Sequence, residues 1–319
     1  MQTKARYSMG LQEWALLITL SILWGGSFFF SKIALGELRP FTIVFARVSL
    51  AALILNMVLL ATGQRLPAAP KRWAAFVVMG ALNNVIPFSL IFWGQTQITS
   101  GMASILNATT PLCTILLAHF LTRDERLTWR KGVGVLFGLL GVVTLIGWKF
   151  VRGLQGNLWA ELAVLGAAIA YACAGIFGKR LSSISPLVVA TGQLTCATIW
   201  MLPIVLLLDR SFMLSIPSRS ILVALMALAV LSTALAYLIY FRLLALVGAS
   251  NLLLVTFLIP VSALTLGALI LSESISLRQL AGMALIGIGL LWIDGRLLSR
   301  FHNTRRAAPS HRYLDDYQI

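Results

Sequence analysis

Acidic residues are scarce in this sequence, with 10 Asp and Glu against 25 Lys and Arg in a chain of 319 residues. Charged residues of both signs make up only 11% of the chain, and hydrophobic residues make up 59%. Soluble globular domains carry roughly 25% charged and 45–50% apolar residues. The composition therefore excludes a soluble, secreted or disordered protein and predicts a chain built from membrane spans.

Cysteine is scarce as well. Cys113, Cys173 and Cys196 fall inside apolar runs without paired spacing, so the sequence offers neither a disulfide framework nor a zinc motif. We expect no metal and no cofactor. The net charge of +15 does not indicate nucleic acid as a partner, because the basic residues lie in short gaps and in a tail rather than on one face of a domain.

Apolar runs of about 20 residues, the length that crosses a bilayer core, recur along the chain. They predict an all-α fold, a polytopic membrane protein with ten transmembrane helices. The third and fourth runs are separated only by a short uncharged gap, yet a single helix over both would be far too long for a bilayer. The predicted spans cover residues 13–34, 41–62, 73–93, 99–121, 129–148, 158–178, 186–208, 219–240, 249–271 and 278–297.

The orientation in the membrane follows from the basic residues in the gaps. With a cytoplasmic N-terminus, seventeen Lys and Arg fall in inside segments and six in outside segments, so the positive-inside rule predicts both termini in the cytoplasm. Residues 1–12 then form a cytoplasmic N-terminus, and residues 298–319 form a basic tail that lies on anionic lipid. A cleaved signal peptide is the alternative for the first span, but its apolar stretch exceeds the roughly 7–15 residues of a signal core.

The chain also repeats itself. Phe30 matches Phe177, Lys32 matches Lys179, Pro111 matches Pro260 and Glu125 matches Glu273, each pair lying 146 to 149 positions apart and in the same order. These matches predict two five-helix units, over residues 13–148 and 158–297. Five is an odd number of crossings, so the second unit must enter the membrane upside down as an inverted repeat.

With these motifs in place, the chain resembles the ten-helix EamA-type transporters of the drug/metabolite transporter superfamily. The likeness rests on LWGGSFFFSKIAL, on DERLTWRKGVG after Pro111 and on SESISLRQLAG after Pro260. It implies an inner-membrane carrier of small metabolites, often an exporter of amino acids or related compounds. It also implies a central cavity formed by helices one to four and six to nine. Where the first half has Trp24 and Arg47, the second has Tyr171 and Gln193, so the cavity is expected to be chemically asymmetric.

Arg47 is the most informative single residue, because it lies about two turns inside the second predicted span. A guanidinium in a bilayer costs roughly 2.5–3.5 kcal/mol on insertion scales, so it should face a cavity or an acceptor. One interpretation is a binding site for a substrate carboxylate or phosphate. The other is a structural tie to backbone carbonyls of neighbouring spans.

Uncharged polar residues near the middle of several spans predict a polar interior, although interhelical hydrogen bonding is the simpler role for any one of them. Asn84, Phe88 and Gln95 recur at helical spacing, and Tyr237 matches Phe88 in the second half, so this face is predicted to line the cavity. Trp24 and Tyr171 either stack on substrate or pack in the core. The predicted substrate-binding residues are Arg47, Trp24, Asn83, Asn84, Phe88, Asn107, Tyr171, Gln193 and Tyr237.

Three further features favour structural roles. Lys32 is expected to reach toward the lipid headgroups. Glu125 and Glu273 are expected to neutralise local Arg residues or to cap the next helix. Small residues in the fifth and tenth spans predict close helix packing, within one protomer or in a homodimer; they are Gly134, Gly138, Gly141, Gly282 and Gly289.

No Asp or Glu lies near the centre of any predicted span, so no residue for ion coupling is evident and facilitated export is the simpler mechanism. The sequence predicts a transporter rather than an enzyme, with a small metabolite and membrane lipids as its partners. A flippase for a lipid-linked substrate is the alternative of the same fold. A membrane enzyme is a weaker one, because HExxH and GxSxG motifs and paired intramembrane aspartates are missing. A channel would need a charged ring or a filter loop.

Overall fold

Helices make up all the regular structure in the described part of the chain. The computed structural model describes residues 9–122, 127–147, 157–209, 217–252 and 254–294. The first half of the chain contains α1 (Leu11–Ala34), α2 (Pro40–Ala61), α3 (Pro70–Gly80), η1 (Ala81–Val85), α4 (Ile86–Gln95), α5 (Ser100–Asn107), α6 (Thr110–Leu121) and α7 (Trp129–Ile146). The second half contains α8 (Leu158–Gly178), η3 (Lys179–Leu181), α9 (Pro186–Leu208), α10 (Arg219–Met226), η5 (Ala227–Leu235), α11 (Ala236–Leu252), α12 (Val255–Ile270) and α13 (Leu277–Asp294).

Eight continuous helical stretches in the described residues are long and apolar enough to cross a membrane. The third joins α3, η1 and α4, and the eighth runs from Arg219 to Gly248 through α10, η5 and α11. Two shorter apolar helices, α12 and α13, complete the set. The prediction of an all-helical polytopic membrane protein is therefore confirmed, including the separation of the third and fourth spans by a tight turn.

The boundary between the eighth and ninth spans differs from the prediction. The eighth was expected to end at residue 240, but its helix continues to Gly248, where a φ of 74° interrupts it. Glycine adopts this left-handed conformation without the steric cost that a Cβ brings. The sequence places the gap between these spans at residues 241–248, which include Arg242, so the break at Gly248 falls at the end of that gap and the helix fills the rest of it. The ninth helix, α12, is correspondingly short, with 16 residues and a length of about 24 Å.

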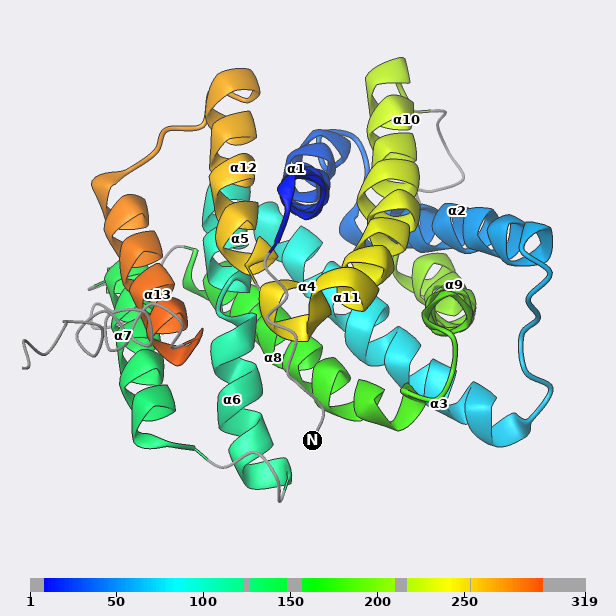
Figure 1. Ribbon diagram of the computed structural model, residues 1–319. Helices are drawn as coiled ribbons and strands as arrows, with labels where there is room; N and C mark the ends of the chain where they lie inside the picture. The colour runs from blue at the N-terminus through cyan, green and yellow to red at the C-terminus, as the bar shows by residue number, and fades with distance from the viewer. Residues whose placement is uncertain (1–8, 123–126, 148–156, 210–216, 253, 295–319) are drawn as a thin grey trace, which may run out of the picture.

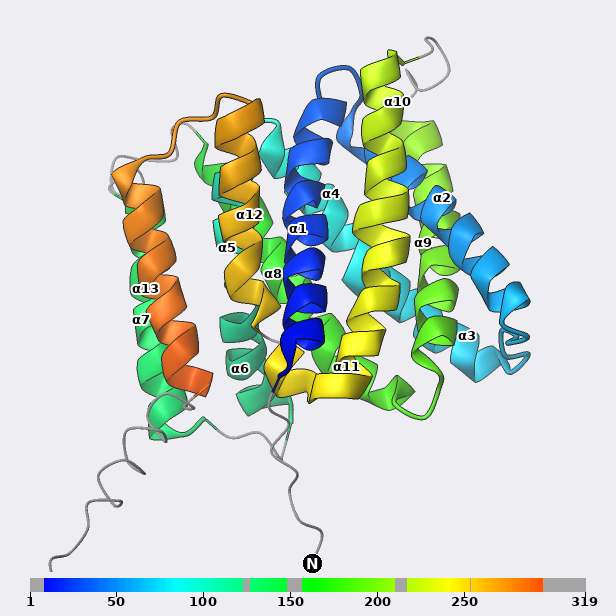
Figure 2. The same cartoon turned by 45° about the horizontal axis from the view of Figure 1, so that its top comes forward.

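The two halves of the chain pack into each other rather than side by side. Helix α1 of the first half packs against α12 of the second, and α8 of the second half packs against α5 and α6 of the first. Likewise, α3 packs against α9 while η5 packs against α2, and α2 packs against α9. Each contact between the halves thus has a counterpart in which the roles are exchanged. Figures 1 and 2 show this interleaving of blue and cyan helices with green, yellow and orange ones.

Helices α7 and α13 form a pair at one side of the bundle (Figure 2). Glycines allow their backbones to meet, since a Cβ on Gly134 would lie 2.5 Å from the carbonyl oxygen of Gly289. A Cβ on Gly141 would lie 2.8 Å from the carbonyl oxygen of Gly282. The predicted small-residue packing is therefore found within the protomer, between the fifth and the last helix.

The bundle has two ends that matter below. In Figure 2, α1 begins and α13 finishes at the lower end, which we call the near end. The opposite end, the far end, carries the connection from α1 to α2, the turn after α4, and the connection from α12 to α13. Under the predicted orientation the far end is outside the cytoplasm. Glu125 and the basic tail, residues 298–319, lie outside the described residues.

Candidate functional site

Arg47 lies in the middle of α2 and is buried, with 4% of its surface exposed. Its Nε donates a hydrogen bond to the Thr233 hydroxyl at 2.9 Å, and Nη1 donates to the Ser27 hydroxyl at 2.8 Å. Nη2 donates to the backbone carbonyl of Ser232 at 3.4 Å. The guanidinium carbon lies 3.8 Å from the centre of the Phe88 ring, in a cation–π contact. We call these five residues the Arg47 group.

Every partner of Arg47 in this group is neutral. Among the described residues, no carboxylate forms an ion pair with it, and its electrostatic neighbours are Tyr171 and Tyr237. Buried charges in proteins are normally paired, because desolvation without a counter-charge is costly. The geometry shows the structural tie between helices, through hydroxyls and one carbonyl. It also leaves the positive charge without a counter-ion among the described residues.

One π-helical segment, η5, contacts Arg47, and its counterpart in the first half is η1. Segment η1 covers Ala81–Val85 and η5 covers Ala227–Leu235, so they begin 146 positions apart, the offset of the internal repeat. A π-helix widens the helical turn and is found frequently at functional sites. In η5 the Thr233 hydroxyl donates to the carbonyl of Leu228 at 2.8 Å while accepting from Arg47. The matched segment η1 carries Asn83 and Asn84.

The side chains of Asn83, Asn84, Gln193 and Tyr237, which we call the amide cluster, connect the halves beside Arg47. Asn83 Nδ2 donates to Gln193 Oε1 at 3.3 Å and to the Tyr237 hydroxyl at 3.4 Å. The Tyr237 hydroxyl donates to Asn84 Oδ1 at 3.2 Å. Asn84 lies one turn before Phe88 on the same continuous stretch of helix. The amide cluster and the Arg47 group are therefore parts of one polar site.

This site retains unused hydrogen-bonding capacity. Asn84 and Ser232 are buried, with 0% and 1% of their surfaces exposed. Asn84 Nδ2 and the Ser232 hydroxyl have no hydrogen-bond partner among the described residues. A buried polar group without a partner costs about 1–3 kcal/mol, so each such atom in a folded protein requires an explanation. A bound molecule that accepts hydrogen bonds from these two groups would provide such an explanation.

The remaining predicted residues lie apart from these hydrogen bonds. The Trp24 ring packs against Tyr240, with the ring centres 5.6 Å apart. Tyr171 packs on the main hydrophobic core, and its hydroxyl forms no hydrogen bond with Arg47 among the described residues. Asn107 lies at the end of α5, and its Oδ1 is buried without a partner among the described residues. Of the nine predicted residues, Arg47 thus contacts Phe88 directly, and hydrogen bonds join Asn83, Asn84, Gln193 and Tyr237.

Ser27 was not predicted as a site residue. It follows Trp24 by three positions on α1 and faces Arg47 with its hydroxyl. The signal was present in the sequence, because a small polar side chain one turn from a mid-span aromatic residue lies on the same helix face. Gln95, predicted to line the cavity with Asn84, instead bonds to Ser31 and to the carbonyl of Phe28. Its contacts join α1 and α4 near the far end.

Lys32 differs from expectation. Rather than reaching toward headgroups, its Nζ donates to the carbonyl oxygens of Gln95 and Ile98, at 2.6 and 3.0 Å. Carbonyls at the C-terminus of a helix lack intrahelical partners and carry partial negative charge, so an ammonium group is favourable there. Lys32 therefore caps the end of α4 and is not part of the Arg47 group.

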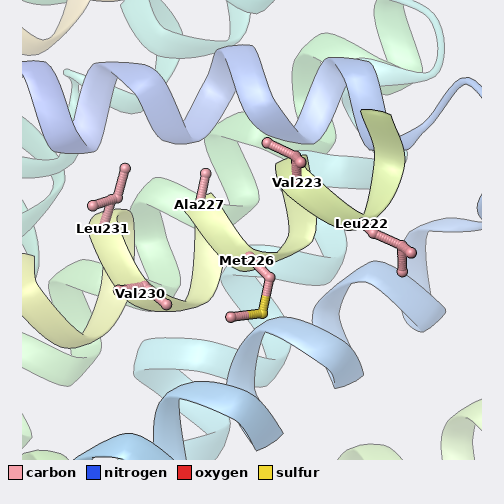
Figure 3. A pocket seen from close by; sticks show the side chains of 6 residues that line it. All are labelled: Leu222, Val223, Met226, Ala227, Val230 and Leu231. Atoms are coloured by element: carbon pink, nitrogen blue, oxygen red, sulfur yellow. The ribbon is translucent and has the colours of Figure 1, made fainter. Parts of the chain in front are cut away.

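Two hollows in the described residues lie away from this site. One has a volume of about 390 Å³ and opens sideways along α10 and η5. Figure 3 shows its lining, which is apolar throughout. The other has a volume of about 210 Å³, lies at the far end and includes Glu161, Gln97 and Arg278 in its lining. The residues around Arg47 are packed against one another and line neither hollow.

Comparison with known proteins gives a consistent result. A model of the EamA-like transporter family matches residues 13–147 and again residues 158–293. An uncharacterized transporter of Bacillus subtilis, YoaV, is 25% identical over 86% of this chain and 94% of its own. Protein PecM of Dickeya dadantii is 26% identical over 90% of this chain and 93% of its own. An uncharacterized inner membrane transporter of Escherichia coli, YedA, is 27% identical over 56% of each chain.

One solved crystal structure shares the fold, with a TM-score of 0.66 and 19% identity, over 91% of this chain and 99% of the other. The two family matches coincide with the two repeats that the sequence predicts. They confirm the resemblance drawn from its motifs.

Proposed function

Since the chain belongs to the EamA-like transporter family, we propose that it exports small metabolites bearing a carboxylate, such as amino acids or related compounds, across the inner membrane. The observation that carries the proposal is Arg47, buried where the halves meet and held only by neutral partners. A substrate carboxylate supplies the counter-charge that the described residues do not, and the planar guanidinium suits it.

The proposal gives the substrate a defined set of donors. The two N–H bonds of Arg47 that remain after its contacts with Ser27, Thr233 and Ser232 lie in the same site as Asn84 Nδ2 and the Ser232 hydroxyl. All of these donate hydrogen bonds, and a carboxylate accepts up to about four. Because η1 supplies Asn84 and η5 supplies Ser232, a bound anion would touch both halves.

Alternating access is the proposed mechanism, with the two repeats inverted relative to each other. The reciprocal packing between the halves supports the inversion, since an axis in the membrane plane exchanges α1–α12 with α8–α5/α6. The Arg47 group is buried in this structure, as expected of a conformation in which the guanidinium is closed off from both sides. Asn83 and Tyr237 of the amide cluster are half-buried. The positive-inside count supports cytoplasmic termini.

We propose that export is facilitated, driven by the concentration gradient of the substrate without a coupling ion. The buried carboxylates in the described residues, Glu161 and Asp209, lie at helix ends rather than beside Arg47. A lipid-linked substrate is the competing cargo. The sideways apolar hollow along α10 and η5 favours it, but that hollow contains none of the polar site residues.

The proposal is tested by metabolite analysis of cells and medium, with cells that express the wild type, Arg47→Ala, Arg47→Lys or an empty vector. Arg242→Lys, an exposed arginine on α11, is the matched control, and membrane abundance is measured for every variant. We expect the wild type and Arg242→Lys to release one class of carboxylates that both Arg47 variants retain. Equal release by the wild type and by a well-expressed Arg47→Ala would overturn the assignment. A change confined to lipids would favour the flippase.

A further inference from the structure

Three carboxylates at the far end each contact the start of a helix in the opposite half of the chain. Glu37, after α1, accepts a hydrogen bond from the backbone N–H of Ser218 at 2.9 Å, where α10 begins. Asp209, after α9, accepts from the backbone N–H and the hydroxyl of Thr42 in α2, at 2.9 and 3.1 Å. Glu37 of the first half thus contacts a helix of the second half, and Asp209 of the second half contacts a helix of the first.

The third carboxylate is Glu273, which follows α12. Its two oxygens accept from the backbone N–H of Ser100 at 2.9 Å, from the Ser100 hydroxyl at 2.7 Å and from the backbone N–H of Gly101 at 3.3 Å. Ser100 and Gly101 open α5 of the first half. The sequence predicted that Glu273 would neutralise local arginines or cap the next helix, and it caps α5 instead.

For α2 and α10 these contacts replace side-chain caps that the helices lack, whereas α5 also has the Thr99 hydroxyl as a cap of its own. The first N–H groups of a helix have no intrahelical partner and carry partial positive charge, so an anion is favourable there. Neither α2 nor α10 receives a side-chain hydrogen bond from its own N-cap residue, Arg39 or Ser218. The carboxylates of the other half fill that role. The hydrogen bonds from the Ser218 hydroxyl and backbone lower the pKa of the Glu37 carboxyl, which favours its charged, accepting form.

The near end is joined differently. Toward the near end, a hydrogen bond between the halves links Asn56 of α2 with the Thr195 hydroxyl of α9, at 3.2 Å. It is a contact between neutral groups and is more easily replaced by water than a charge-assisted one. The three carboxylate caps between the halves described above all lie at the far end.

We propose that Glu37, Asp209 and Glu273 form a latch that holds the far end closed and that must release when the carrier opens to that side. Separating the halves at the far end breaks all three caps at once. The latch presupposes the second conformation that alternating access requires, and to that extent it rests on the proposed function. The latch proposal specifies no substrate, and it can be tested without one.

The test is a distance measurement between spin labels in the purified full-length protein in lipid nanodiscs. After the three native cysteines have been replaced by serine, labels are placed at Gln97→Cys and Ser220→Cys, exposed far-end positions of the two halves. Distances are compared with and without the triple substitution Glu37→Gln, Asp209→Asn and Glu273→Gln. The amides keep the size of each side chain and one acceptor oxygen, so they remove the charge with little change in packing.

We expect the triple variant to show a longer far-end distance that the parent populates only slightly. Loss of one carboxylate charge at a helix start should shift the equilibrium by about two- to fivefold, and loss of three by about five- to a hundredfold. Glu13→Gln is the matched control, because Glu13 caps the start of its own helix, at Gly10, near the opposite end. It should leave the far-end distance unchanged.

An unchanged distance distribution in the triple variant, or an equal shift in Glu13→Gln, would overturn the latch. If the triple variant does not fold, the single variants Glu37→Gln and Glu273→Gln are measured in the same way. The absence of a shift in both would be equally contradictory. The two proposals can fail separately. If the far-end distance lengthens in the triple variant but the wild type exports no carboxylate, only the proposed function is refuted. If the wild type exports carboxylates but the far-end distance does not change in the triple variant, only the latch is refuted.

Discussion

The two halves of this protein share one architecture but differ in chemistry at matched positions. Both halves have a π-helical segment in the third span, and these begin 146 positions apart. Yet the first half carries Arg47 on its second span where the second half carries Gln193, and it carries two amides where the second half carries hydroxyls. The repeat therefore determines where the polar site lies, and the substitutions that distinguish the halves determine its charge.

The largest effect should follow from breaking this asymmetry at Arg47. A hydrogen bond to a charged group is worth about 1.5–3 kcal/mol and one between neutral groups about 0.5–1.5 kcal/mol. Arg47→Ala should therefore weaken the apparent affinity for substrate by about ten- to a hundredfold. Its repeat mate, Gln193→Ala, should weaken it by no more than about tenfold. Concentration-dependent transport by both variants, at equal membrane abundance, measures the difference. Equal losses would mean that the charge has no special role.

The next effect concerns the hydroxyl that holds Arg47. Thr233→Val keeps the shape of the side chain but removes the acceptor for Arg47 Nε. Leaving a buried donor without a partner should cost about 1–3 kcal/mol in the free energy of unfolding. Thr233→Ser restores the hydroxyl and should regain most of that loss. Unfolding of the purified protein in mixed micelles compares the three forms, and a Val variant as stable as the wild type would show that this bond contributes nothing.

The peripheral helices, in contrast, should respond alike in both halves. A Cβ on Gly141 or on Gly282 meets the facing helix at a carbonyl oxygen or at Leu145, so substitution of either glycine by Ala should destabilise by about 1–3 kcal/mol through overpacking. The matched controls are Gly132→Ala and Gly287→Ala, where a Cβ meets nothing within 4 Å. These controls should be neutral or slightly stabilising. Thermal unfolding of all four variants tests the symmetry, and destabilisation by the controls would contradict it.

The smallest effect should come from Asn83. Its hydrogen bonds to Gln193 and Tyr237 are long, at 3.3 and 3.4 Å, and Asn83 itself is only half-buried. Asn83→Ala should therefore cost less than about 1 kcal/mol of unfolding free energy. Asn84→Ala should cost no more than Asn83→Ala, because it removes an unpartnered buried donor together with one acceptor. A large loss of stability in either variant would mean that the amide cluster is a structural core.

Hydropathy and the repeat predicted much of the fold, because crossing a bilayer restricts the chain to apolar helices of a limited length. What they missed lies where the pattern carries no signal. The helix of the eighth span continues past its predicted end at residue 240, through Arg242, to a break at Gly248 that depends on one backbone angle. The π-helical segments are likewise invisible to a pattern with the ordinary helical period, since each inserts its widened turn without a change in composition.

The site was predicted less completely than the fold. Arg47 and the amides could be identified because polar groups are expensive in hydrocarbon, whatever the tertiary structure. Ser27 and the carboxylate caps could not, because a serine in a helix and an acidic residue in a loop are common, and only packing between the halves gives them partners. Lys32 was misassigned for the same reason, since its acceptors belong to a turn 63 and 66 residues away.

Uptake by proteoliposomes is the direct test of whether Arg47 binds an anionic group of the substrate. A panel of small carboxylates is offered beside their uncharged primary amides. Each pair differs in the charge of one group and little else. We expect the wild type to take up members of the carboxylate series and to discriminate against the matching amides. Arg47→Ala should lose this preference. Equal uptake of acids and amides, or a preference that survives the loss of Arg47, would contradict the claim that the buried guanidinium binds the substrate's anionic group.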